Sequence, residues 1–190
     1  MKILAINTAL KESSIALIEG KKVLLEESWG AFSREAEMLM PEIHKMLKKA
    51  KTNYEEIKKI IVLRGPGSFT GIRIGITAAN TISYLLKVPI YSLTTFDFLY
   101  EKFKKYPIIL YAGRKELYIK SSAKEPPVIH PGTEVEGHFY GELLQEQEKT
   151  FKKIKLEKSK KTFGQVIANL SAKSLKKEKI VEPLYIKKPF

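Results

Sequence analysis

The fold of this 190-residue chain is decided by one glycine-rich stretch, Arg64-Gly65-Pro66-Gly67-Ser68-Phe69-Thr70-Gly71-Ile72-Arg73-Ile74-Gly75. It follows an apolar, β-branched run at 59–63 that predicts a buried strand, and it leads into a segment that predicts a helix to about Lys87. A strand, a glycine turn and a helix N-terminus in this order form a geometry that holds anions. Gly71 is followed by Ile72 and Arg73, where a P-loop needs Lys and Ser or Thr, and no G-x-G-x-x-G occurs. These departures exclude P-loop NTPases and dinucleotide-binding domains.

Small residues recur at every fourth position of this region, at Gly67, Gly71, Gly75, Ala79 and Ser83. That spacing places them on one helix face. Because a glycine inside a helix costs about 1 kcal/mol relative to alanine, a stripe of them indicates that another backbone approaches closely. Two interpretations stay open, which are packing against the chain's own sheet and contact with a protein partner.

Outward from this stretch, the N-terminal part predicts alternating strands and helices. Strands are expected at 2–7, 14–19 and 22–29, the last two forming a hairpin at Gly20, and again at 88–93. Helices are expected at 33–50 begun by Ser33, at 52–58 begun by a Thr52–Glu55 capping box, and from Thr94 or Thr95 to about Lys105. This order predicts an α/β fold with a mixed sheet.

The composition changes near Tyr106, which places a domain boundary there and divides the chain into 1–105 and 106–190. In the second part we expect a hairpin of 106–111 and 116–121, then short strands and loops over 123–150. A helix at 162–175 and an extended tail from Ile180 follow.

Composition and charge exclude several classes of protein. Apolar residues make up 44% of the chain, which excludes wholesale disorder, and the lack of cysteine removes disulfides and thiol chemistry. No apolar run is long enough to span a membrane, and a soluble cytoplasmic protein is expected.

Positive charge is concentrated at the end of the chain. Residues 151–190 carry 12 basic and 3 acidic groups, which is +9 of the net charge of +13. Such a block attracts polyanions such as RNA, and the lysines with which we test this are Lys152, Lys153, Lys155, Lys160 and Lys161. A solvated surface is the alternative.

Groups able to perform catalysis are scarce. There are three histidines and one aspartate, Asp97, and neither H-E-x-x-H nor G-x-S-x-G occurs. The first strand ends in a polar pair and runs into a hairpin, as in actin-like ATPases, but Asn7 stands where Mg²⁺ would favour a carboxylate. A weak, vestigial phosphate contact is the remaining expectation, and its candidates are Asn7, Thr8, Gly65 and Ser68.

Together these segments resemble the TsaB (YeaZ) family. The glycine stretch is the most specific match. Weaker matches are the opening residues 2–8, the segments 37–41 and 113–118, and the C-terminal 182–186. The resemblance implies a two-lobed actin-like ATPase (ASKHA, RNase H-like) α/β fold with mixed sheets and a shortened second lobe.

The chain departs from this family at several positions. The family usually has aspartate where Asn7 and Tyr111 stand, and histidine where Glu35 stands. The metal-binding histidines of the related TsaD transferases correspond to Thr95 and Leu99, which cannot replace them. We therefore expect no catalytic residue, no bound metal and no resident cofactor, and leave open ATP or ADP at a joint interface.

The function implied by the resemblance is a non-catalytic subunit that pairs with TsaD and supports threonylcarbamoyl transfer to tRNA adenosine (t6A formation). A TsaE ATPase would be the third component, tRNA would be met through the complex, and a homodimer would form when TsaD is absent. The residues expected at the partner interface are Gly67, Gly71, Arg73, Gly75, Ala79, Met38 and Met46. The alternatives are a stand-alone actin-like ATPase or kinase and, third, a glycoprotease-like peptidase.

Overall fold

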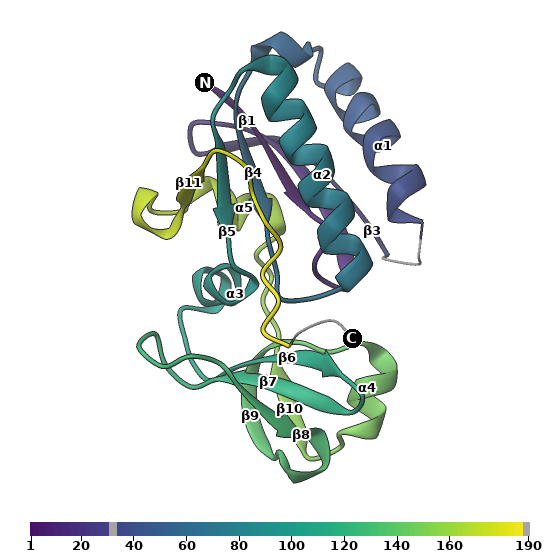
Figure 1. Ribbon diagram of the computed structural model, residues 1–190, viewed down its shortest axis with the longest axis vertical. Coiled ribbons are helices and arrows are strands. Elements are labelled where there is room, and N and C mark those ends of the chain that lie inside the picture. The colour runs from purple at the N-terminus through teal and green to yellow at the C-terminus, as the bar shows by residue number, and fades with distance from the viewer. Residues whose placement is uncertain (31–33, 188–190) are drawn as a thin grey trace. The chain divides into compact units, whose positions relative to one another are not determined.

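A computed structural model describes residues 1–30 and 34–187 and divides them into two compact units (Figure 1). The first unit contains Met1–Phe98 and Lys161–Ile186, and the second contains Leu99–Lys160 and Lys187. The first boundary follows Phe98, where residue 105 was expected, and the chain returns to the first unit at Lys161, although the whole of 106–190 was expected in the second part. The return follows from packing: the segment contributes a helix against the first sheet and an edge strand to it. No helix among the described residues has the length and apolar character needed to cross a membrane.

The first unit is built on a six-stranded mixed sheet in the order β11-β5-β4-β1-β2-β3. Its strands are β1 (Lys2–Asn7), β2 (Glu12–Glu19), β3 (Lys22–Gly30), β4 (Ile57–Leu63), β5 (Ile90–Leu93) and β11 (Lys176–Glu178). β1, β4 and β5 pair in parallel, whereas β2, β3 and β11 pair antiparallel to their neighbours. The expected strands and the hairpin at Gly20 are confirmed.

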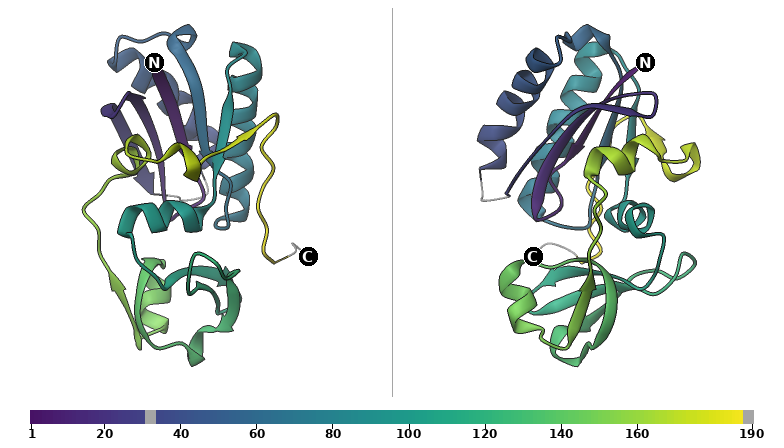
Figure 2. Two further views of the ribbon diagram at one scale, coloured as in Figure 1. Left: turned by 90° about the vertical axis from the view of Figure 1, so that its left-hand side faces the viewer. Right: turned by 180° about the vertical axis from the view of Figure 1, so that it is seen from behind.

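Helices cover both faces of this sheet. Figure 2 shows α1 (Glu35–Lys49) and α2 (Phe69–Leu86) on one face and the short α5 (Phe163–Ala168) on the other. The central strand β1 is therefore buried on both sides, and Leu4, Ala5 and Ile6 are all inaccessible. A strand covered on both faces has a continuous apolar run rather than an alternating pattern, and residues 3–6 form such a run.

Two helix predictions differ from the structure, and a third falls outside the described residues. Ser33, the expected N-cap of α1, lies outside the described residues, and the described cap, Arg34, makes no side-chain capping bond. The expected helix at 52–58 is a single 3-10 turn (Tyr54–Glu56), in which the Glu56 carboxylate accepts the Asn53 N–H at 2.9 Å. The capping pair is thus one residue later than Thr52–Glu55. α5 ends at Ala168, and a separate 3-10 turn (Ala172–Ser174) begins where the Ser171 hydroxyl accepts the Lys173 N–H.

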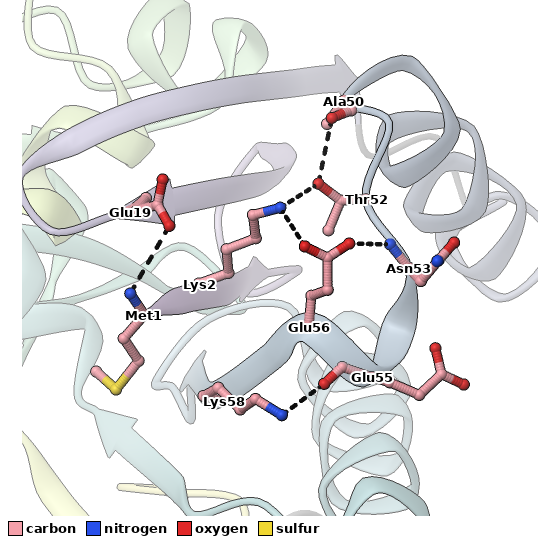
Figure 3. A network of polar contacts seen from close by, with 9 residues as sticks. All are labelled: Met1, Lys2, Glu19, Ala50, Thr52, Asn53, Glu55, Glu56 and Lys58. Atoms are coloured by element: carbon pink, nitrogen blue, oxygen red, sulfur yellow. Dashed lines mark hydrogen bonds and ion pairs between the residues drawn. The ribbon is translucent and has the colours of Figure 1, made fainter.

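A polar network ties the start of β1 to the connection between α1 and β4 (Figure 3). The Lys2 ammonium donates to the Thr52 hydroxyl at 2.8 Å and to the Glu56 carboxylate at 2.7 Å. The Thr52 hydroxyl in turn donates to the Ala50 carbonyl at 3.2 Å. The hydrogen bonds from Lys2 and from the Asn53 N–H hold the pKa of the Glu56 carboxyl below its usual value.

This lowered pKa predicts a pH-dependent contribution to stability. A carboxyl group whose pKa is depressed by folding stabilises the protein above its unfolded-state pKa, and this contribution is lost as the pH falls through the folded-state value. We therefore expect Glu56→Gln to lower the urea midpoint at neutral pH, with the difference from wild type disappearing in acid. Glu55→Gln is the control, because the Glu55 carboxylate points away from the network in Figure 3. A difference that persists unchanged in acid would contradict the prediction.

The second unit has its own five-stranded sheet, in the order β10-β9-β6-β7-β8. Its strands are β6 (Ile108–Gly113), β7 (Glu116–Lys120), β8 (Val128–Pro131), β9 (Gly137–Glu142) and β10 (Ile154–Glu157). The core on this sheet includes Ile109, Leu117, Phe139, Leu143 and Phe151. The hairpin of β6 and β7 and the short strands after residue 123 are confirmed. The helix α4 (Gln145–Thr150) and the strand β10 were not expected from the sequence. The helix α3 (Thr95–Phe103) contains the boundary between the units.

Candidate functional site

The carboxyl ends of parallel strands are where open α/β sheets bind ligands. In the first unit this edge is formed by the residues after β1 and β4, where the expected phosphate contacts lie. Asn7 is 2% exposed, and its side-chain oxygen accepts the N–H groups of Ala9 at 3.0 Å and Leu10 at 3.3 Å. Its amide nitrogen donates to the Glu12 carbonyl at 2.9 Å. All the polar atoms of this side chain are thus used to close the turn between β1 and β2.

The other three candidates for a phosphate contact also make hydrogen bonds within the chain. They are Thr8, Gly65 and Ser68. The buried Thr8 hydroxyl donates to the Gly71 carbonyl at 2.6 Å, and the Ser68 hydroxyl caps α2 by accepting the Gly71 N–H at 3.1 Å. The Gly65 carbonyl accepts the Thr95 N–H at 2.8 Å. The structure brings the four expected residues together at one edge, but their hydrogen bonds are made within the chain.

The glycine stripe of α2 packs against the end of β1. A Cβ atom at Gly67 would lie 2.1 Å from the Ala9 carbonyl oxygen, and one at Gly71 would lie 2.0 Å from the Thr8 carbonyl oxygen. At Gly75 it would lie 2.1 Å from the Thr8 hydroxyl. The sequence left open whether the stripe packs against the chain's own sheet or against a partner. In the structure it packs against the chain's own strand.

This packing corrects the expected partner interface. Gly71, Gly75, Ala79 and Met46 are buried inside the first unit, and Gly67 lies against Ala9. Of the seven residues expected at the interface, Met38 is half-buried, and Gly67 and Arg73 are exposed. A residue buried in its own unit has no surface to offer a partner.

The solvent-facing side of α2 lies at other positions. Its exposed residues repeat at spacings of three and four, and they are Thr70, Arg73, Thr77, Thr81 and Tyr84. Tyr84 is 83% exposed and the adjacent Leu85 is 69% exposed, and Met40 is an exposed apolar residue on α1. With the exposed Phe69, these seven residues make up the outer face of the helix pair, which consists of Met40, Phe69, Thr70, Arg73, Thr77, Thr81, Tyr84 and Leu85. The helical spacing of Thr70, Thr77 and Thr81 was the signal in the sequence that could have identified it.

The C-terminal segment runs alongside α2 and is held to it. Asn80 accepts the Val181 N–H and donates to the Val181 carbonyl, both at 3.0 Å. At the helix start, the Arg73 guanidinium donates to the Tyr185 hydroxyl at 3.0 Å and lies over the Phe69 ring, which also contacts Tyr185. The tail is therefore part of the first unit, and its residues border the outer face.

The resemblance placed Thr95 and Leu99 where related transferases carry metal-binding histidines, and the structure buries both residues. Thr95 and Leu99 are fully buried, and the Thr95 hydroxyl has no hydrogen-bond partner within the described parts of the chain. Over residues 1–30 and 34–187, no three His, Asp or Glu side chains gather in a way that could hold a metal ion.

The five lysines expected to face RNA are all exposed, and the boundary between the two units falls among them. Lys152, Lys153, Lys155 and Lys160 belong to the second unit, whereas Lys161 belongs to the first. Lys153 pairs with Glu136 at 3.3 Å on the surface.

Comparison with known proteins places this architecture in a family. Residues 31–130, which span both α1 and α2, match the family model of TsaD, tRNA N6-adenosine threonylcarbamoyltransferase. The chain is 29% identical over 157 residues to the TsaB of Buchnera aphidicola from Schizaphis graminum, covering 80% of this chain and 74% of that one. It is 34% identical over 99 residues to the TsaB of Bacillus subtilis, covering 52% of this chain but only 43% of that one. Both are named tRNA threonylcarbamoyladenosine biosynthesis proteins.

The solved structure of YeaZ from Pseudomonas aeruginosa has the same fold, with a TM-score of 0.68, 17% identity and coverage of 88% of this chain and 89% of that one. The two-lobed ASKHA-like α/β fold is thereby confirmed. The chain carries a TsaD-type domain and belongs to the TsaB (YeaZ) family.

Proposed function

We propose that this chain is a non-catalytic, cytoplasmic subunit that pairs with a TsaD-type transferase and supports threonylcarbamoyl transfer to tRNA adenosine. The names of its relatives support a place in t6A formation. The observation that carries the non-catalytic role is the strand-end edge of the first unit. There Thr8 and Gly71 are joined by a 2.6 Å hydrogen bond, and the glycines of α2 leave no room even for a methyl group. A phosphate group would have to displace these intrachain contacts.

The outer face of the helix pair is the proposed contact surface for the transferase. Because the TsaD family model spans α1 and α2 of this chain, the two partners are expected to present related helix pairs. Related surfaces can pair around a pseudo-twofold axis, as identical ones do in twofold-symmetric dimers. The same face would form a homodimer when the transferase is absent. Arg73 is the one residue of the interface expected from the sequence that also lies on this face.

We place no resident cofactor in this chain. A nucleotide at the joint interface would be held by both subunits, and a TsaE-type ATPase is the proposed third component.

The other candidate function is a stand-alone ATPase. It is separated from the subunit role by two measurements on the purified chain, Mg²⁺-dependent ATP turnover and size-exclusion chromatography with the transferase. We expect no turnover by the chain alone and a mixed complex with the transferase. Turnover by the chain alone would favour the ATPase.

A further expectation concerns tRNA binding by the assembled complex. Replacing five lysines with glutamine should weaken tRNA binding and make it less dependent on salt, because each lost phosphate contact lowers the salt slope by roughly one. The five are Lys152, Lys153, Lys155, Lys160 and Lys161. Fluorescence anisotropy with labelled tRNA at several KCl concentrations measures both quantities. If affinity and slope stay unchanged, these lysines form a solvated surface only.

A further inference from the structure

The helix α2 carries a single charged side chain. Of its 18 residues, Phe69–Leu86, only Arg73 is charged, and it is exposed on the outer face of the helix pair. The other members of that face are threonines, aromatic residues, a leucine and a methionine. Among the described residues, the guanidinium contacts a hydroxyl and an aromatic ring, neither of which carries a negative charge. The described part of the chain therefore does not compensate the positive charge of Arg73.

The Arg73 guanidinium is held in a defined position although it is exposed. Its Nε donates to the Tyr185 hydroxyl at 3.0 Å, and its Cζ lies 4.1 Å from the centroid of the Phe69 ring. The Phe69 and Tyr185 rings are 5.1 Å apart, and the tail is anchored beside them by the Leu184 N–H, which donates to the Arg64 carbonyl at 2.8 Å. Because the bond to Tyr185 uses Nε, the two terminal nitrogens remain for a ligand. Their fork matches the two oxygens of a carboxylate.

Burial of Arg73 in an interface requires an acidic group on the partner, because a charge removed from water without a counter-charge is costly. The helix pair of a second copy has no carboxylate to spare. Its buried acidic residue is Glu35, and its two exposed or half-buried ones already form ion pairs, Glu37 with Arg34 at 3.2 Å and Glu42 with Lys45 at 3.1 Å. Self-association through the outer face would thus bury Arg73 without a counter-charge from the helix pair.

We infer that Arg73 determines the specificity of the outer face, by binding a carboxylate of the transferase and by disfavouring a second copy of this chain. The inference rests on the proposed function, in which the transferase contacts this face. Specificity is a difference between two affinities, and one charge acts on both of them here. Tyr185 is a positioning residue, since its hydroxyl orders the guanidinium before the partner binds.

The test compares two equilibria of the full chain in a buffer without nucleotide or RNA. Isothermal titration calorimetry with the purified transferase gives the Kd of the mixed complex, and sedimentation velocity over a concentration series gives the Kd of self-association. Arg73→Gln should weaken the mixed complex at least about tenfold, because the carboxylate of the transferase loses its counter-charge. The same variant should strengthen self-association at least about threefold, because an uncompensated charge is no longer buried.

Three further variants separate charge, geometry and position. Arg73→Lys keeps the charge without the fork, so the affinity of its mixed complex should lie between those of wild type and Arg73→Gln. Tyr185→Phe keeps the ring without the hydroxyl, and it should weaken the mixed complex only when Arg73 is present. Lys21→Gln is the matched control, because it removes an exposed positive charge from the turn between β2 and β3, outside the outer face. It should bind the transferase as wild type does.

Glu182 is the alternative counter-charge in a second copy, because it is an exposed carboxylate on the tail that borders the outer face. Weaker self-association in both Arg73→Gln and Glu182→Gln would establish that pairing and overturn the inference. We expect Glu182→Gln to leave self-association unchanged.

Unchanged affinity of the mixed complex in Arg73→Gln overturns the inference, as does an equal loss in Lys21→Gln, which would indicate net charge alone. An effect of Arg73→Gln that is seen only after ATP or tRNA is added would assign the guanidinium to a phosphate group and also overturn it. If the wild-type chain does not bind the transferase, the proposed function fails together with this inference. If it binds but the affinity does not depend on residue 73, this inference alone is overturned.

Discussion

Alanine in place of Gly71 is expected to destabilise the first unit by about 3 kcal/mol, the upper range for an overpacked core. The added methyl group would lie 2.0 Å from the Thr8 carbonyl oxygen, a backbone atom that cannot turn away. At an ordinary helix position the same substitution is stabilising, by about 1 kcal/mol. The sign of the effect therefore decides whether α2 and the end of β1 are in contact. Urea denaturation followed by circular dichroism measures it.

Thr77→Ala is the matched control on the same helix. Thr77 is exposed, and alanine has the higher helix propensity, so this variant should be as stable as wild type or slightly more so. Gly75→Leu provides an independent check, because its side chain would meet the Thr8 hydroxyl and should unfold the unit. A folded Gly71→Ala protein of undiminished stability would show that the glycine face is free.

The second large effect is expected at the outer face of the helix pair. Tyr84→Asp/Leu85→Asp should abolish the complex with the TsaD-type transferase and leave the melting temperature unchanged. Both side chains are mostly exposed in this chain, at 83% and 69%, so their replacement removes little packing. Buried in an interface, aromatic anchors each contribute at least about 2 kcal/mol, roughly thirtyfold in Kd. Isothermal titration calorimetry with the purified transferase gives the affinity.

Ile180→Asp serves as the control for adding an acidic group to an exposed apolar position. Ile180 belongs to the first unit, is 70% exposed and lies outside the outer face. It should bind the transferase as wild type does. Equal weakening by Ile180→Asp, or full binding by the Tyr84 and Leu85 variant, would place the partner surface elsewhere.

The first sheet was predictable from the sequence because its signals are local. Residues 3–6 form an uninterrupted apolar run, Gly20 allows a tight turn, and the glycine stretch separates β4 from α2. The stripe of small residues likewise indicated a close backbone approach. It could not indicate which backbone, since a helix face that meets the chain's own strand has the same sequence as one that meets a partner.

The tail could not be placed from local signals. Lys176–Glu178 is polar and short, and its strand exists only because β5 offers an open edge. Residues 161–186 return to the first unit through contacts such as Asn80 with Val181, which are 101 positions apart in sequence. For the same reason, local signals do not show that the fold divides the lysines of the basic C-terminal block between the two units.

The central claim, that this chain supports a transferase without catalysing the reaction itself, is tested most directly by reconstitution. Purified TsaD-type transferase and TsaE-type ATPase from the same cell are incubated with the threonylcarbamoyl donor, ATP and unmodified tRNA, with and without this chain, and t6A is quantified by mass spectrometry. We predict t6A only when the chain is present, none from the chain alone, and loss of product with Tyr84→Asp/Leu85→Asp. Equal t6A formation in the absence of the chain, or formation by the chain without the transferase, would contradict the claim.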